Sequence, residues 1–267
     1  MPTLPSILFR DLMIIIIISL IGLIILFSLA TILFFQPRWF LKSVIKIAPG
    51  VIYFFETNDP IVAITIDDSP HPKTTPKILE VLAKYKVYAT FFIIGERVLG
   101  NETIINYILE NGHEIGNHLM KDEKSIELDI NEFEVQLLKA NSTLITLLNQ
   151  YNTTIKEPQF HRINWFRPGG GWYNSKMIEV AKKHGYKSVL GSIFPYDTHI
   201  SSSQFASYQI LLNLRPGAII ILHDSGKDSI SGEWGEQTIQ TLETILPEIK
   251  RRGYRTVTLS EMLELER

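Results

Sequence analysis

Histidine and aspartate side chains recur in this chain directly after short apolar segments. Asp67 and Asp68 follow the run IVAITI, His118 lies two residues after HEIG, and His223 ends the run AIIILH. Imidazole and carboxylate groups hold divalent cations and transfer protons near neutral pH. The chain has no cysteine, so a thiol nucleophile and a cysteine-ligated zinc site are excluded. The residue types therefore favour chemistry assisted by a metal ion or by acid–base groups.

Three of the polar residues suit a cation. Asp68, His118 and Asp122 supply two carboxylates and one imidazole, a set that suits zinc, cobalt, manganese or iron and not copper(I). His118 and Asp122 are four residues apart, so both project to one face of a helical turn. A divalent ion with an open coordination position lowers the pKa of bound water from roughly 15.7 to about 7 and polarises a carbonyl oxygen. We predict a divalent metal site here, with zinc as the first choice.

Two further groups fit proton transfer. Asp67 points elsewhere than its neighbour Asp68, which leaves one carboxylate free as a general base while the other binds metal, and His223 is then placed to protonate a leaving amine. Each residue also has an ordinary structural explanation. Paired aspartates form turns, Asp122 lies in the charged run KDEKS, and a histidine after four apolar residues resembles a core histidine. Their repetition at the ends of successive predicted strands favours a common site.

The elements that position these residues alternate between strand and helix patterns after Pro60. Helical periodicity is clearest at Phe133, Leu137, Ala140 and Leu144. Seven short segments typical of strands lie at 61–66, 87–94, 113–116, 164–167, 186–192, 218–223 and 254–259. The alternation predicts an α/β fold with a parallel sheet of about seven strands, closed or nearly closed and covered by helices. In such folds the carboxyl ends of the strands carry the chemistry.

Two residues are expected to mark helix boundaries. Thr75, followed by Pro76 at the first helical position, is typical of an N-cap. Pro247 lies within the last long helical segment and is expected to kink or split it, because proline removes one backbone hydrogen bond.

The N-terminal part differs from the rest of the chain. Residues 12–35 are 24 residues without a charge, about 36 Å long as a helix against a hydrocarbon core of roughly 30 Å. A signal peptide has a shorter apolar region and a small-residue cleavage site, whereas this stretch ends in FFQPRWF. We therefore predict an uncleaved single-pass anchor rather than a signal peptide or a buried soluble helix. The predicted division is an N-terminal flank (1–11), the anchor (12–35), a juxtamembrane linker (36–60) and one domain (61–267).

The overall composition narrows the class of protein. The chain has 267 residues, 45% hydrophobic and 20% charged, which is ordinary for a folded protein and excludes disordered and collagen-like chains. Its 26 basic and 28 acidic residues give a net charge of −2, so no basic surface indicates a nucleic-acid partner. Nothing in the sequence specifies an oligomeric state.

Four segments occur in an order that resembles a known family. TIDDSP, GHEIGNH, FRPGG and IIILH, with ATFFIIG between the first two and RRGYRTVTLSEML at the end, resemble the motifs of the polysaccharide deacetylase family (NodB homology, carbohydrate esterase group 4). The resemblance extends from about Ile61 to Leu263. It implies a distorted parallel β/α barrel and a metal-dependent hydrolase that removes N-acetyl groups from amino-sugar units of a polysaccharide resembling chitin, peptidoglycan or an exopolysaccharide.

The resemblance also implies roles for individual residues. Asp67 is similar to the family's general base, Asp68 and His118 to its metal ligands, and His223 to its general acid.

Four more positions complete the implied site. Arg167 is similar to the arginine that braces the site near the base, and Asp197 to the carboxylate that orients the catalytic histidine. Backbone amides around Gly169 and Gly170 are expected to help stabilise an oxyanion.

Some positions depart from the family pattern. Asp122 stands where the family usually has a second metal-binding histidine, which leaves the identity of the metal open. Ser69 replaces the usual glycine of the first motif. The third motif lacks its usual aromatic residue, which is expected either to widen the groove or to move sugar contacts to Trp172 and Tyr173. Trp234 fits a glycan groove and internal packing equally well.

Two alternatives to polysaccharide deacetylation stay open. One keeps the chemistry but changes the substrate to a small amide, ester or cyclic imide. The other is a non-catalytic carbohydrate-binding protein in which Asp122 no longer secures the metal.

The predicted orientation in the membrane rests on two opposing arguments. Arg38, Lys42 and Lys46 follow the apolar stretch, and basic residues on that side favour a cytoplasmic domain. A polysaccharide substrate favours an extracytoplasmic domain, and long domains translocate largely regardless of charge. We expect the domain outside the membrane.

Overall fold

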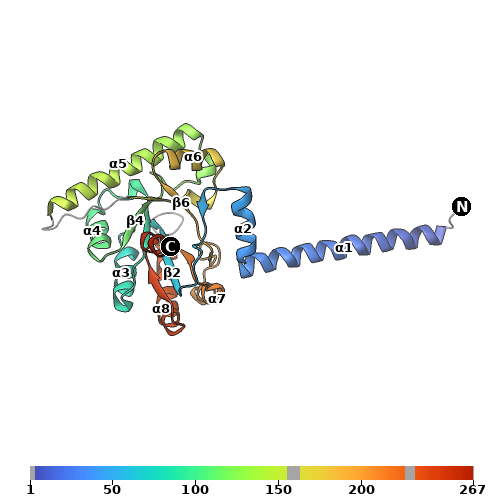
Figure 1. The fold of residues 1–267 in the computed structure, drawn as a ribbon. Helices are drawn as coiled ribbons and strands as arrows, with labels where there is room; N and C mark the ends of the chain where they lie inside the picture. The colour runs from blue at the N-terminus through green and yellow to red at the C-terminus, as the bar shows by residue number, and fades with distance from the viewer. Residues whose placement is uncertain (1–3, 155–162, 226–231, 267) are drawn as a thin grey trace.

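The computed structural model describes residues 4–154, 163–225 and 232–266. A rounded α/β domain carries one long helix, α1 (Leu4–Phe35), which extends away from it (Figure 1). A shorter helix, α2 (Arg38–Ile47), connects α1 to the domain.

One parallel sheet forms the centre of the domain. Its strands are β1 (Val51–Ile52), β2 (Ile61–Ser69), β3 (Thr90–Ile93), β4 (Glu114–Asn117), β5 (Trp165–Phe166), β6 (Lys187–Val189), β7 (Ala218–His223) and β8 (Arg255–Val257). The order is β1-β6-β5-β4-β3-β2-β7, and β8 also pairs with β2. All nine residues of β2 are buried, as expected for a strand covered on both faces.

The two ends of the sheet approach each other. An isolated bridge joins Phe54 to Ala218, and another joins Ile193 to Ile220, which connects the β1–β6 end with β7. This curvature confirms the predicted distorted parallel β/α barrel. The sequence did not indicate β1, because two residues are too few to show a strand pattern.

Helices cover the outer face of the sheet (Figure 1). They are α3 (Thr74–Tyr85), α4 (Glu102–Glu110), α5 (Ile130–Thr154), α6 (Ser175–Lys183), α7 (Ser203–Asn213), α8 (Glu233–Arg251) and α9 (Leu259–Leu265), with short 3₁₀ turns η1 (Gly95–Arg97), η2 (Ser125–Glu127) and η3 (Gly169–Gly171). The largest apolar cluster joins β2, β3 and β7 to α3, α4, α5 and α8. This packing fixes the strand ends on which the polar residues lie.

One expected helix start is wrong, and one expected split does not occur. The helix α3 begins at Thr74 with Lys73 as its N-cap, because the Thr75 hydroxyl is used in a hydrogen bond to the carboxylate of Asp224. Pro247 does not split α8, which runs without a break from Glu233 to Arg251. Buried side chains on both sides of Pro247, including Ile245 and Ile249, stabilise the continuous helix through packing.

Part of the segment 36–60, predicted as a linker, packs into the domain. It contains α2 and β1, and Phe55 packs in a core cluster with Trp165. The ordered domain therefore begins near Val51 rather than at Ile61, because apolar residues before Pro60 complete the barrel.

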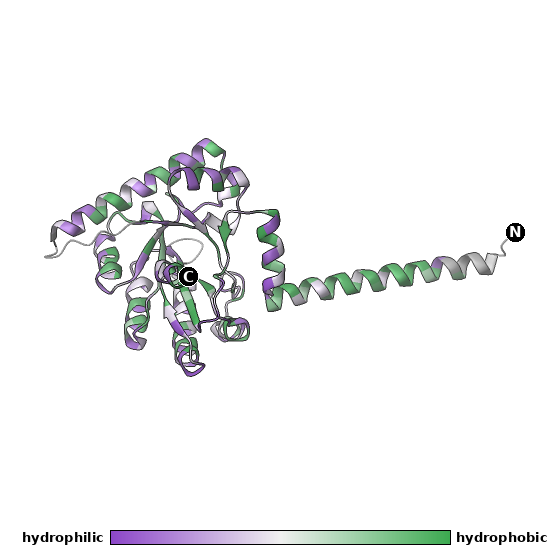
Figure 2. Cartoon of the chain, in the orientation of Figure 1, coloured by the Kyte–Doolittle hydropathy of each residue, from purple (hydrophilic) through white to green (hydrophobic). Residues whose placement is uncertain are grey.

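The helix α1 is apolar along nearly its whole length (Figure 2). The part Asp11–Phe35 is long and apolar enough to cross a membrane, with a mean hydropathy of 3.2 and 0% of its most apolar window buried against the domain. A signal sequence near an N-terminus can meet the same criteria of length and hydropathy.

Candidate active site

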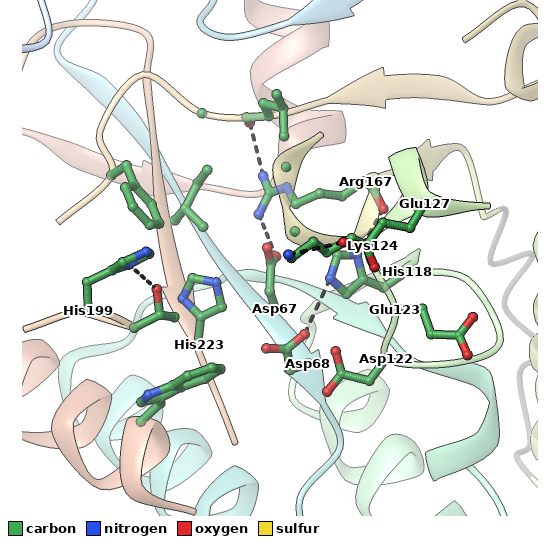
Figure 3. Close-up of a pocket in the computed structure, with 18 of the residues that line it drawn as sticks. Asp67, Asp68, His118, Asp122, Glu123, Lys124, Glu127, Arg167, His199 and His223 are labelled. Carbon is green, nitrogen blue, oxygen red and sulfur yellow. Dashed lines mark hydrogen bonds and ion pairs between the residues drawn. The ribbon is translucent and has the colours of Figure 1, made fainter. Parts of the chain in front are cut away.

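A cavity of about 810 Å³ opens at the carboxyl ends of the strands. Figure 3 shows that side chains from distant parts of the sequence converge on it. Asp67 and Asp68 come from β2, His118 follows β4, Arg167 follows β5, and His223 ends β7. Asp122 also lines this cavity. Six polar residues singled out in the sequence therefore share one pocket.

Arg167 pairs with Asp67 at the wall of the cavity. The Arg167 side chain is only 1% exposed, and its Nη1 atom donates to Asp67 Oδ1 at 2.6 Å and to Thr65 Oγ1 at 2.7 Å. Its Nη2 atom donates to the carbonyl oxygen of Leu190 at 3.0 Å, and its guanidinium lies 4.2 Å from the centre of the Phe92 ring. Burial lowers the pKa of Arg167, and the charge of Asp67 opposes this effect. The pair holds a carboxylate in one orientation at the cavity.

Asp68 and His118 form a second buried pair. Their Oδ1 and Nε2 atoms are 3.4 Å apart. His118 Nδ1 is 2.9 Å from the carbonyl oxygen of Arg167, which only accepts, so Nδ1 carries a proton and Nε2 faces Asp68. Asp68 itself has φ of 63°, a value that is uncommon outside glycine and turns its carboxylate toward His118.

Burial and nearby charges act in opposite directions on the pKa values of this pair. Burial lowers the pKa of His118, but the hydrogen bond to Asp68 and the charges of Asp67 and Asp68 outweigh burial and raise it. Burial raises the pKa of Asp68, but His118, His223 and Arg97 outweigh burial and lower it. A carboxylate beside an imidazole nitrogen is also a suitable donor set for a divalent ion. Asp68 and His118 therefore fit a metal.

Asp122, the third expected metal ligand, lies differently. Its side chain is 42% exposed, and its Oδ2 atom accepts a hydrogen bond from Arg97 Nη2 at 2.7 Å. Among the residues that the structure describes, no three histidine or acidic side chains are grouped closely enough to hold an ion. The structure thus brings Asp68 and His118 together as a pair, while Asp122 is at the same cavity but bonded to Arg97.

Arg97 was not singled out in the sequence. It lies in η1 directly after β3, and its Nη1 atom also donates to the carbonyl oxygen of Asp68 and to Ser225 Oγ. Its position after a predicted strand, at the same rim as the other polar residues, was the signal that pointed to it. Burial and the charge of Asp68 raise the pKa of Asp122, and Arg97 opposes them.

His223 and Asp197 form the third pair. His223 Nδ1 lies 3.0 Å from Asp197 Oδ2, which also accepts from the backbone N–H of His223 at 3.1 Å. Burial lowers the pKa of His223, but Asp197 outweighs burial and raises it to about 9. The rings of Phe194 and Trp234 flank the imidazole, with centres 6.3 Å and 5.8 Å away. His223 is therefore a cationic acid at neutral pH, with its Nδ1 atom held by Asp197.

The glycine turn differs in part from the expectation. The backbone N–H of Gly169 donates to Ser125 Oγ at 2.8 Å, so this amide is already bonded outside the cavity. Gly170 and Gly171 do line the cavity. Both have positive φ, at 65° and 72°, which a glycine adopts without strain.

The expected aromatic contacts also differ. Trp172 is 66% exposed and, like Tyr173, is not among the described residues that line the cavity. The Tyr173 hydroxyl instead hydrogen-bonds the Tyr53 hydroxyl at 2.8 Å. Among the described residues, Tyr53, Phe194 and Trp234 provide aromatic surface to the cavity.

Comparisons with known proteins agree with this arrangement. The family model described as polysaccharide deacetylase matches residues 55–189. A peptidoglycan-N-acetylglucosamine deacetylase of Bacillus cereus is 37% identical over 208 residues, which cover 77% of this chain and 89% of that protein. A chitooligosaccharide deacetylase of Sinorhizobium fredii is 29% identical over 202 residues, covering 74% and 89%. The crystal structure of the Bc1960 peptidoglycan N-acetylglucosamine deacetylase superposes with a TM-score of 0.68 at 27% identity, covering 80% of this chain and 92% of that one.

Proposed function

Because this chain belongs to the polysaccharide deacetylase family, whose relatives above hydrolyse carbon–nitrogen bonds of N-acetylated sugars, we propose that it removes N-acetyl groups from N-acetylglucosamine units of peptidoglycan. The observation that carries this proposal is the placement of Asp67 and His223 at one cavity, each held by a buried partner of opposite charge. A fixed carboxylate and a cationic imidazole are the base and the acid that amide hydrolysis needs.

In the proposed reaction, Asp67 accepts a proton from the water that attacks the acetamide carbonyl carbon. Arg167 keeps the carboxylate of Asp67 oriented through the hydrogen bond from its Nη1 atom. His223 donates its proton to the nitrogen as the carbon–nitrogen bond breaks, and Asp197 stabilises the imidazolium before transfer. The products are acetate and a free amino sugar.

We propose that Asp68 and His118 hold a divalent ion, most simply zinc, with cobalt, manganese and iron as alternatives. Such an ion polarises the carbonyl and lowers the pKa of water when bound. Asp122 accepts from Arg97 through Oδ2, so Oδ1 is the atom that a third ligand contact would use. Gly170 stays a candidate for oxyanion contact, whereas Gly169 already donates to Ser125.

The walls of the cavity suit a sugar ring. Tyr53, Phe194 and Trp234 provide aromatic surface, and apolar sugar faces stack on such rings. Lys124, Glu123 and Glu127 provide polar groups at the rim for hydroxyl groups.

We further propose that residues 12–35 anchor the chain in a membrane as a single span, with the domain on the extracytoplasmic side, where peptidoglycan lies. The apolar composition of α1 and the exposed Trp39 at the start of α2 support this placement, because tryptophan favours the membrane interface. A reporter fused after Arg267 tests the orientation.

The central test measures acetate release from peptidoglycan and from N-acetylglucosamine oligomers by the full-length protein in detergent, with zinc or cobalt added. We expect Asp67→Asn and His223→Ala to lower kcat by about 10²–10⁴-fold, the usual contribution of a general base or acid. The surface variants Asp59→Asn and His184→Ala serve as matched controls. Undiminished activity in Asp67→Asn contradicts its assigned role.

The same assay separates the alternatives. A groove enzyme gains rate with oligomer length, whereas a hydrolase of small amides, esters or cyclic imides does not. Oligomer binding without acetate release identifies a carbohydrate-binding protein.

A further inference from the structure

The carboxyl end of α1 is bonded to the catalytic domain rather than left to solvent. The last turn of a helix exposes four carbonyl oxygens that lack partners within the helix. Here each has one: Ile32 O accepts from Gln36 N at 2.8 Å, Leu33 O from Tyr196 Oη at 2.8 Å, Phe34 O from Asn213 Nδ2 at 3.1 Å, and Phe35 O from Arg215 Nη2 at 2.7 Å. Side chains of the domain therefore supply three of the four caps. The guanidinium of Arg215 also complements the negative end of the helix dipole.

Gln36, the residue after α1, makes the most specific contact of this joint. Its Nε2 atom donates to the carbonyl oxygen of Phe194 at 2.7 Å, and its Oε1 atom accepts from the Phe194 N–H at 2.7 Å. Both backbone polar groups of Phe194 are thus held by one side chain from 158 residues away. Gln36 also has φ of 41°, a conformation that costs energy outside glycine and persists only where contacts enforce it.

Phe194 begins the short loop that carries Asp197. The Phe194 ring contacts the Tyr196 ring, with centres 5.1 Å apart, as well as the imidazole of His223. Tyr196 also has a positive φ, 60°, and bonds the end of α1. Asp197 Oδ1 is buried and has no hydrogen-bond partner among the described residues, so the side chain is held through Oδ2 and through the backbone that precedes it.

We propose that Gln36 is a positioning residue for the reaction, because the end of α1 holds the Phe194–Asp197 loop and thereby sets the contact between Asp197 and His223. This inference rests on the proposed role of His223 as general acid. It makes the N-terminal helix a support for the active site as well as a tether. An acid that loses its fixed orientation slows the chemical step and leaves substrate binding nearly intact.

The test compares kcat and KM of full-length variants in detergent with the acetate-release assay. Gln36→Ala removes both bonds to Phe194, and we expect kcat to fall by about tenfold with KM within about twofold of the wild type. Gln36→Glu keeps the acceptor for the Phe194 N–H but, when ionised, places a second acceptor oxygen against the Phe194 carbonyl oxygen, so we expect a loss of kcat at least as large as in Gln36→Ala. The basic limb of the pH–rate profile should also move to lower pH in Gln36→Ala, as contact with Asp197 weakens.

Lys42→Ala is the matched control. It breaks an ion pair between α2 and Glu56, at the same junction but without contact to the Phe194 loop, and is expected to leave kcat unchanged. Thermal unfolding reports whether each variant is folded. If Gln36→Ala does not fold, the kcat and the pH–rate profile of Tyr196→Phe test the proposal instead. This variant removes only the hydrogen bond from the Tyr196 hydroxyl to Leu33.

Two outcomes overturn the inference, and they are distinguishable from each other. If His223→Ala abolishes activity while Gln36→Ala and Tyr196→Phe retain wild-type kcat and pH profile, Gln36 does not position the acid. If His223→Ala itself stays active, the proposed catalytic role fails and this inference fails with it.

Discussion

The two sides of the cavity differ in how their charges are balanced. On one side, Asp67 faces Arg167 and Asp197 faces His223, so each carboxylate has a buried cation from the protein. On the other side, Asp68 and Asp122 face each other, with His118 and the shared Arg97 as counter-charges. On the first side, residues of the protein alone therefore balance the charges of the carboxylates. The second depends on an imidazole and one shared guanidinium, and it is where we propose that a divalent ion binds.

The largest effect is expected from a substitution on the first side of the cavity, where each carboxylate has a buried cation. Arg167→Met leaves the buried Asp67 carboxylate without its cation, which costs about 3–5 kcal/mol in comparable buried pairs. We expect loss of detectable acetate release and a decrease in Tm of about 10 °C, measured by thermal unfolding in detergent. Arg252→Met, which removes an exposed arginine, is the control. An unchanged Tm in Arg167→Met would show that the pair is not needed for stability.

The second effect concerns the other side of the cavity, where we propose the metal site. His118→Ala removes the imidazole of the Asp68–His118 pair, and we expect zinc affinity to fall by about 100-fold or more, as measured by titration calorimetry. His184→Ala, a surface histidine, should bind zinc like the wild type. Equal affinity in His118→Ala and wild type would place the metal elsewhere.

The third effect is a change in pH dependence. Asp197 raises the pKa of His223 to about 9, so the acid is protonated below that pH and the rate falls as pH rises through it. Asp197→Asn removes the charge, the pKa of His223 falls, and the basic limb of kcat/KM moves to lower pH. We expect a loss of about tenfold at pH 8 that shrinks in more acidic buffer. A basic limb that stays in place contradicts the pairing.

The smallest effect is expected from substitution of Arg97, which pairs with Asp122 on the side of the proposed metal site. Arg97→Gln frees Asp122 from its ion pair and removes a positive charge near Asp68, so zinc affinity should rise by about a few-fold. Asp122→Asn should lower zinc affinity less than His118→Ala does. If Arg97→Gln weakens zinc binding, Arg97 supports the site rather than competing with the metal for Asp122.

Much of the barrel was predictable because its strands are continuous apolar runs that end abruptly in polar residues. The run before Asp67 and the run ending at His223 are buried strands that pair in register, with Asp67 opposite His223. Asp67 and His223 could therefore be assigned to the same edge of the sheet from the sequence alone, because each ends an apolar run. The short β1 strand and the start of α3 could not, because tertiary hydrogen bonds decide both.

The partners of the site residues were harder to predict. The sequence indicated Asp122 as a ligand from its spacing to His118, but the guanidinium of Arg97 reaches it from a different loop. Trp172 and Tyr173 follow the expected motif, yet neither is among the described residues that line the cavity. Phe194 and Trp234 line it instead, and both rings lie beside the imidazole of His223.

The sequence by itself determined the apolar helix, the alternation that builds a parallel sheet, and the residue types at the strand ends, because hydrophobic periodicity and local motifs are properties of neighbouring residues. Only the tertiary structure decided which carboxylate each cation pairs with and that Gln36 bonds the loop of Asp197. Those contacts join segments up to 158 residues apart, and their geometry is set by how helices and strands pack rather than by any local pattern.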